Sequence, residues 1–277
     1  MRITDALDRA RAIRRDSAAP IDIQVGPGVY VGSYTNTGST IEPLPIRLDV
    51  SHLKLIGTTK MEKDESGLPT GVIKSNSNTL LLADPPLEGM RSILALSSPN
   101  VTVENLSFDA GSGHGGWVVR VDQVQDFTLV NNYVTGGNTD SAMGIHVSRS
   151  SGKILGNYVT RGGCGICIVA DDVSSPARFE LTFANNQIHQ NTHTPALISF
   201  TRFTASNTPA QLNPFGNAQS FKYVESSFYD LTYFNGELDG YWFDNPETDP
   251  VDGRVLNNVL RIHGNEIHSG RFIPYSH

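Results

Sequence analysis

The sequence of 277 residues contains little cysteine. Its two cysteines, Cys164 and Cys167, have the CxxC spacing of some redox and metal sites. They lie in a strand-like segment, where side chains three positions apart point to opposite faces, so that a disulfide between them is too long to close. No second cysteine pair completes a zinc site. The cysteines are therefore interpreted as structural, and no metal ligands are assigned.

Long hydrophobic runs and an excess of positive charge are also missing. No stretch approaches the roughly 18 apolar residues that span a bilayer, and the formal net charge is −7 at pH 7. Neither nucleic acid nor a membrane is therefore expected as a partner. The residues after Met1 lack the apolar centre of a signal peptide. The localisation stays open between a cytoplasmic protein and the mature form of a secreted one.

The sequence does contain a repeated phrase, in which two alternating apolar residues precede Asn or Gly and a further apolar residue follows. The central Asn or Gly positions are Asn105, Asn131, Gly156, Asn185 and Gly264. The steps between them are 26, 25, 29 and 79 residues, and the last is close to three copies. A fixed period of this size indicates stacked repeats, and the alternation indicates strands. The prediction is an all-β fold, a parallel β-helix (solenoid), that forms one domain over residues 1–277.

The N-terminal residues predict a cap for the stack. Residues 3–14 place apolar side chains on one helical face, with Thr4 as the N-cap. A short capping helix within residues 1–20 would cover the open end of the apolar stack. The alternating segment 21–25 then predicts a strand, and the Gly-Pro-Gly-Val-Tyr phrase ending at Tyr30 predicts a tight turn.

This opening phrase, from Ala6 to Tyr30, closely resembles the start of right-handed parallel β-helix proteins of the pectin lyase-like superfamily. Those proteins begin with a capping helix, an apolar strand and a PGxY turn. The resemblance runs through the repeats to Ser199 and, more loosely, to Ile267. It implies a right-handed parallel β-helix with a short N-terminal capping helix, and it does not imply one enzyme, because fold and function separate readily.

Two segments interrupt the repeats and are expected to be loop insertions, residues 58–92 and 203–253. Long loops on one side of a solenoid commonly wall its binding groove. The second insertion is dense in aromatic residues, which predict either sugar-stacking platforms or a small satellite core. Tyr241 and Trp242 are the candidates for sugar contact. The last residues, up to His277, show no capping helix, which predicts a homo-oligomer through that end or a segment missing from this chain.

Aligning the repeats places equivalent side chains one above another, about 4.8 Å apart. The first outward row consists of Arg120, His146, Cys167 and Ser199. The second consists of Asp109, Thr135, Thr160, His189 and His268, with Arg161 beside it. The richest predicted patch is Asp109, His114, Arg120, Asp140, His146, Arg149 and Arg161.

A histidine with a carboxylate and arginines on one rigid face can abstract a proton and stabilise the negative charge that develops. A polysaccharide lyase needs this chemistry at a uronate. His146, Asp140, Arg120 and Arg161 are the predicted catalytic residues. Residues predicted to bind substrate are Asp109, His114, Arg149, Tyr241 and Trp242. A hydrolase would instead need two carboxylates, which Asp140 with Asp171 or Asp172 could supply.

The motifs of the superfamily's enzymes are incomplete here. Gly113-His-Gly115, Asn138-Thr-Asp140 and Asp171-Asp172 resemble polygalacturonase motifs, but their order differs and the RIK motif is missing. The leading hypothesis is a carbohydrate-active enzyme, a polysaccharide lyase or glycoside hydrolase, that acts on a polysaccharide in an outer groove. The alternative is a non-catalytic carbohydrate-binding or structural β-helix module, such as a surface or tail-fibre-like protein. Calcium is the candidate cofactor, although its ligands form no clear motif.

Overall fold

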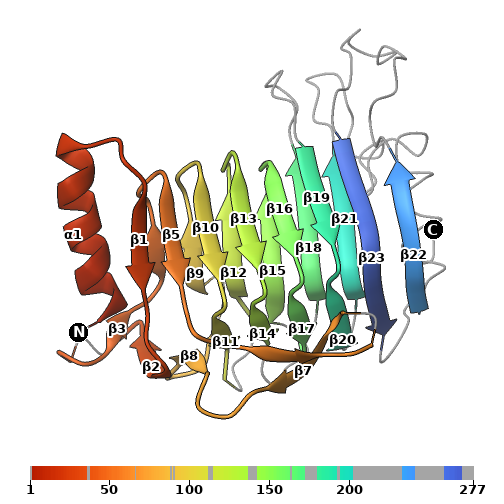
Figure 1. The fold of residues 1–277 in the computed structure, drawn as a ribbon, viewed down its shortest axis with the longest axis horizontal. Coiled ribbons are helices and arrows are strands. Elements are labelled where there is room, and N and C mark those ends of the chain that lie inside the picture. The colour runs from red at the N-terminus through yellow and green to blue at the C-terminus, as the bar shows by residue number, and fades with distance from the viewer. Residues whose placement is uncertain are drawn as a thin grey trace, which may run out of the picture.

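The structure is a computed structural model that describes residues 2–35, 38–65, 67–87, 89, 91–111, 115–136, 142–162, 164–171, 180–191, 194–201, 233–240 and 259–269. One helix, α1 (Ile3–Asp16), precedes a series of mostly parallel strands that lie side by side along the long axis of the molecule (Figure 1). Helix α1 lies at one end of this series and buries Ile3, Leu7 and Ala10. No described helix is long and apolar enough to cross a membrane.

The parallel strands form three ladders, in which each repeat adds one strand, or rung, to each ladder. The first ladder contains β1 (Ile21–Gln24), β5 (Leu53–Ile56), β10 (Val101–Glu104), β13 (Phe127–Val130), β16 (Gly152–Leu155) and β19 (Glu180–Ala184). The second contains β2 (Gly28–Ser33), β8 (Thr79–Ala83), β11 (Ser107–Asp109), β14 (Tyr133–Thr135), β17 (Tyr158–Thr160) and β20 (Gln187–Asn191), with β3 (Glu42–Pro43) beside β2. The third contains β4 (Ile46–Leu48), β9 (Ser92–Leu96), β12 (Trp117–Asp122), β15 (Met143–Ser148), β18 (Cys164–Asp171) and β21 (Thr194–Thr201).

All three ladders bury side chains in one hydrophobic core. Val103 of the first ladder, Phe108 of the second and Ile145 of the third are each at most 1% exposed and belong to the same cluster. The pairing follows the sequence period, since Leu129 pairs with Val103 on one side and with Ile154 on the other. Parallel strands around an apolar core confirm the all-β prediction and the alternation from which it was made.

Strand β23 (Val259–Ser269) corrects the interpretation of the longest step. Its first half pairs with β19 and its second half with β20, so that Ile262 lies opposite Phe183. The 79-residue step therefore adds a single rung beyond Asn185, not about three copies. Strand β22 (Tyr233–Gly240) pairs antiparallel with β23 and is the described part of the expected insertion 203–253.

Residues 58–92 hold more regular structure than the predicted loop. Strands β6 (Met61–Lys63) and β7 (Pro69–Ile73) form an antiparallel hairpin, and β8 belongs to the second ladder. Figure 1 shows β7 running across the strands of the second ladder. Residues 270–277 lie outside the described residues, so the predicted self-association through that end stays a prediction.

Buried asparagines connect successive rungs at the corner between the first and second ladders. The backbone N–H of Asn132 donates to Oδ1 of Asn157 over 3.0 Å, and the N–H of Asn157 donates to Oδ1 of Asn186 over 3.0 Å. Each side-chain NH₂ donates to a backbone carbonyl of the first ladder, Nδ2 of Asn157 to Leu129 over 3.0 Å. This confirms the expected structural role, because the amides satisfy backbone groups that water does not reach.

The N-terminus of α1 is capped by a residue distant in sequence. Arg2, not Thr4, is the N-cap, and its backbone N–H donates to the carboxylate of Asp5 over 3.0 Å. The buried carboxylate of Glu42 accepts from the N–H of Ile3, and from the N–H and hydroxyl of Thr4 over 3.1 and 2.8 Å. A carboxylate at this end also interacts favourably with the helix dipole.

Replacing Glu42 with alanine is expected to lower the free energy of unfolding by about 2–3 kcal/mol, because two buried helix N–H groups lose their charged acceptor. Urea unfolding followed by circular dichroism measures the change. Glu62→Ala, at an exposed position of β6, is the control and should stay within about 0.5 kcal/mol of the unchanged protein. Equal stability of both variants would contradict a capping role for Glu42.

Candidate functional site

The first outward row lies on the third ladder. Arg120 of β12 pairs with His146 of β15, and His146 pairs with Cys167 of β18, as predicted. The next partner is Leu197 and not Ser199, which lies opposite Val169. The prediction for Ser199 was therefore wrong by two residues, because the connection before β21 differs in length from the others.

His146 lies in a largely buried environment on β15. The Trp117 ring, at the start of β12, is 5.2 Å from the imidazole between centroids and is inclined to it by 40°. Burial, together with the charge of Arg120, lowers the pKa of His146 from 6.5 to about 4, against the opposing effect of Asp122. The imidazole is therefore neutral at neutral pH and can accept a proton.

Two arginines share one carboxylate beside His146. Nη2 of Arg120 lies 3.0 Å from one oxygen of Asp122, and Nη2 of Arg149 lies 3.5 Å from the other. The Arg120 guanidinium also lies 4.9 Å above the Trp117 ring. Two cations and one anion leave a local positive charge on a protein with a net charge of −7. We call Trp117, Arg120, Asp122, His146 and Arg149 the His146 cluster.

Unsatisfied polar atoms concentrate in this cluster. Four buried side-chain nitrogens among the described residues lack a hydrogen-bond partner. Three of them belong to the His146 cluster: Nε of Arg120, Nδ1 of His146 and Nε of Arg149. Buried polar groups in folded proteins are almost always paired, so that three unpaired nitrogens on one face suggest a surface shaped for a ligand or ordered water.

The lowered pKa of His146 predicts a loss of stability in acid. Between pH 6.5 and pH 4 the unfolded protein protonates this side chain before the folded protein does, so the free energy of unfolding falls as the pH falls. Above that range the histidine contributes no pH dependence, and below it the full loss of about 3 kcal/mol is reached. Urea unfolding of the unchanged protein and of His146→Phe, from pH 4 to pH 7, measures this difference. Carboxylates titrate in both proteins, so parallel pH profiles would contradict the assignment.

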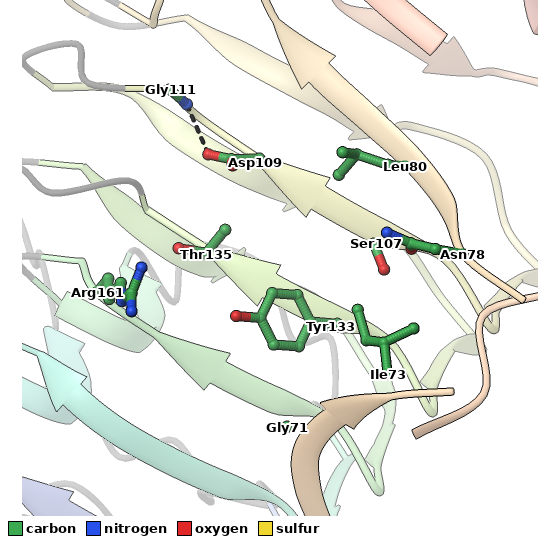
Figure 2. Close-up of a pocket in the computed structure, with 10 residues that line it drawn as sticks. All are labelled: Gly71, Ile73, Asn78, Leu80, Ser107, Asp109, Gly111, Tyr133, Thr135 and Arg161. Atoms are coloured by element: carbon green, nitrogen blue, oxygen red, sulfur yellow. Dashed lines mark hydrogen bonds between the residues drawn. The ribbon is translucent and has the colours of Figure 1, made fainter. Parts of the chain in front are cut away.

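The second outward row lies on the second ladder and has a pocket of its own. Asp109, Thr135 and Thr160 occupy successive rungs as predicted, but Thr135 and Thr160 are buried rather than exposed. Figure 2 shows the pocket, whose volume is about 450 Å³ and in which Tyr133 lies between Arg161 and Ile73. We call it the Tyr133 pocket. Its lining residues are Gly71, Ile73, Asn78, Leu80, Ser107, Asp109, Gly111, Tyr133, Thr135 and Arg161.

The predicted patch is therefore divided between two ladders. Arg120, His146 and Arg149 lie in the His146 cluster, whereas Asp109 and Arg161 line the Tyr133 pocket. His114, Asp140, Tyr241 and Trp242 lie outside the described residues, so their predicted roles stay predictions. Within the described part of the chain, no group of three or more His, Cys, Asp and Glu residues could hold a metal ion.

Two aromatic residues of these sites were not predicted from the sequence. Trp117 precedes the outward row by three residues and contacts both Arg120 and His146. Tyr133 stacks on Tyr158 of the next rung, with centroids 5.6 Å apart and the rings inclined by 5°. The two tyrosines occupy the same repeat position, two residues after Asn131 and Gly156, and this coincidence was the available signal.

Comparison with known proteins adds little to this description. No family model matches the chain, and no curated protein matches it. A crystal structure from Parabacteroides merdae, whose assignment as a glycosyl hydrolase is provisional, covers 73% of this chain and 88% of its own at 12% identity and a TM-score of 0.37. A likeness at this TM-score carries no conclusion about fold or function.

Proposed function

We propose that this chain is a single-domain, right-handed parallel β-helix that cleaves a uronate-containing polysaccharide in an outer groove, as a lyase. The carrying observation is the His146 cluster, in which a neutral histidine and two arginines lie on neighbouring rungs of one ladder. Stacked ladders that share one core support the β-helix, and the resemblance to the pectin lyase-like superfamily supports its hand.

In the proposed reaction, the substrate carboxylate lies against Arg120 and Arg149, which stabilise the negative charge that develops next to it. His146 takes the proton from the carbon that bears this carboxylate. The electron pair of that C–H bond forms the new C=C bond, the glycosidic C–O bond at the neighbouring carbon breaks, and the leaving oxygen is protonated by water. A lyase is favoured over a hydrolase because the cluster's carboxylate, Asp122, is already shared by two arginines.

Non-catalytic carbohydrate binding is the second candidate. It is favoured by the same lowered pKa, because a histidine whose pKa is about 4 is a weak base. The arginines and their unpaired Nε groups would then bind the carboxylates of a polysaccharide without cleaving it.

A panel of plant, algal and bacterial polysaccharides, with and without calcium, distinguishes these functions. A lyase produces reducing ends together with the ultraviolet absorbance of unsaturated products. Reducing ends without absorbance would overturn the lyase in favour of a hydrolase and would direct attention to Asp140, Asp171 and Asp172. Retention in gels that contain the polysaccharide, without either signal, would support the binding module.

A further inference from the structure

The Tyr133 pocket is separate from the His146 cluster. Its residues come from β8, β11, β14 and the end of β17 in the second ladder, and from β7, whereas the cluster lies on the third ladder and the turn after β15. The hairpin β6–β7 forms one wall and the second ladder forms the other (Figures 1 and 2).

The hairpin wall fits closely against the ladder. Gly71 of β7 has a φ of +76°, and a Cβ added there would lie 2.5 Å from the Tyr158 ring. Nearer the hairpin turn, Oδ2 of Asp64 lies 3.5 Å from the amide nitrogen of Gln187 on β20. The position of the hairpin, and with it the width of the pocket, therefore depends on the absence of a side chain at residue 71.

The polar end of the pocket presents an acceptor and a cation that do not pair with each other. The Asp109 carboxylate is oriented by the backbone N–H of Gly111 over 2.8 Å. Arg161 has no carboxylate of another described residue within 4.0 Å. Since Arg161 follows Thr160, two rungs beyond Asp109, the two backbone positions are about 10 Å apart.

The rest of the pocket is less polar. Ile73 and Leu80 contribute aliphatic side chains and Tyr133 contributes its ring. Burial raises the pKa of the Tyr133 hydroxyl, so it is neutral and can donate a hydrogen bond at neutral pH. A ligand that fits carries a carboxylate at one end, hydroxyl groups at the other, and apolar C–H groups between them.

We propose that the Tyr133 pocket binds one uronate residue, and that it is a saccharide site additional to the His146 cluster. The uronate carboxylate pairs with the Arg161 guanidinium, its ring hydroxyls donate to Asp109, and its C–H face packs against Tyr133. A single pyranose ring, with a hydrogen bond at each end, matches the distance between these groups. The site goes beyond the proposed cleavage, because it requires no reaction at His146.

Isothermal titration of the full chain with the monosaccharides glucuronate and galacturonate tests this proposal. Saturable binding of at least one uronate is expected, with weaker binding of glucose, galactose and acetate. Arg161→Gln should weaken uronate binding about tenfold or more, since one charged hydrogen bond is worth about 1.5–3 kcal/mol. Arg15→Gln, at an exposed position of α1, should leave it unchanged. Absence of binding, equal binding of glucose, or no effect of Arg161→Gln would overturn the proposal.

Two glycines of the hairpin provide a matched pair of variants. Gly67 and Gly71 both have positive φ, so alanine strains the backbone at either position, but a Cβ at Gly67 meets nothing within 4 Å. Gly71→Ala should weaken uronate binding and Gly67→Ala should not. Equal affinities would contradict the hairpin's part in the site. His146→Ala should keep uronate binding, so that failure of the proposed cleavage and failure of this pocket are distinguishable.

Discussion

His146→Ala is expected to lower kcat/KM at least about 100-fold on whichever polysaccharide the protein cleaves, because general base catalysis contributes about 10²–10⁴-fold. His146 has the required protonation state, since its pKa of about 4 leaves the imidazole neutral at neutral pH. The arginines beside it have no comparable capacity to accept a proton, because their guanidinium groups stay charged. The measurement is the initial rate of unsaturated-product absorbance.

Ser148→Ala is the matched control for this prediction. Ser148 is two residues further along β15, on the same outward row as Asp122, and carries no group that accepts a proton at neutral pH. It should keep most of the activity. Thermal unfolding of both variants separates a catalytic effect from a loss of fold, and full activity of a folded His146→Ala protein would overturn the assignment.

Asn157→Ala is expected to lower the free energy of unfolding by about 3–5 kcal/mol, because several buried groups lose their partners and each costs about 1–3 kcal/mol. Oδ1 of Asn157 accepts from the N–H of Asn132 over 3.0 Å, and Nδ2 donates to the carbonyls of Leu129 and Leu155 over 3.0 and 3.1 Å. Asn157 is fully buried, so water cannot replace these contacts in the folded protein.

Urea denaturation measures this loss, with Lys153→Ala as the control. Lys153 is an exposed residue of β16, in the same rung as Asn157, and its removal should change stability by less than about 0.5 kcal/mol. A stability of Asn157→Ala equal to that of the control would mean that neighbouring backbone groups pair without the asparagine.

Much of the ladder architecture was predictable because its register follows the sequence period. The row from Arg120 to His146 to Cys167 and the row from Asp109 to Thr135 were both found by aligning repeats. That period fixes which residues are neighbours within one ladder, because side chains at equivalent positions stack.

The division of the candidate site between two ladders was less accessible from the sequence. A list of outward residues does not say at what angle two ladders meet, so Arg161 and His146 were assigned to one patch. The Tyr133 pocket also depends on the hairpin β6–β7, and the sequence around Gly71 gives no period that shows where this hairpin packs. Contacts between a repeat and a non-repeating segment are set by tertiary packing alone.

The single rung formed by β23 has a consequence for the order of assembly. Leu129 meets its next partner, Ile154, after 25 residues, whereas Phe183 meets Ile262 only after 79. Closing the longer loop costs about 1 kcal/mol more in chain entropy, since the cost grows with the logarithm of loop length. Rungs from α1 to β20 can therefore zip up by short successive closures. The strand that spans two ladders is favoured to dock late, onto a template that the earlier rungs have already built.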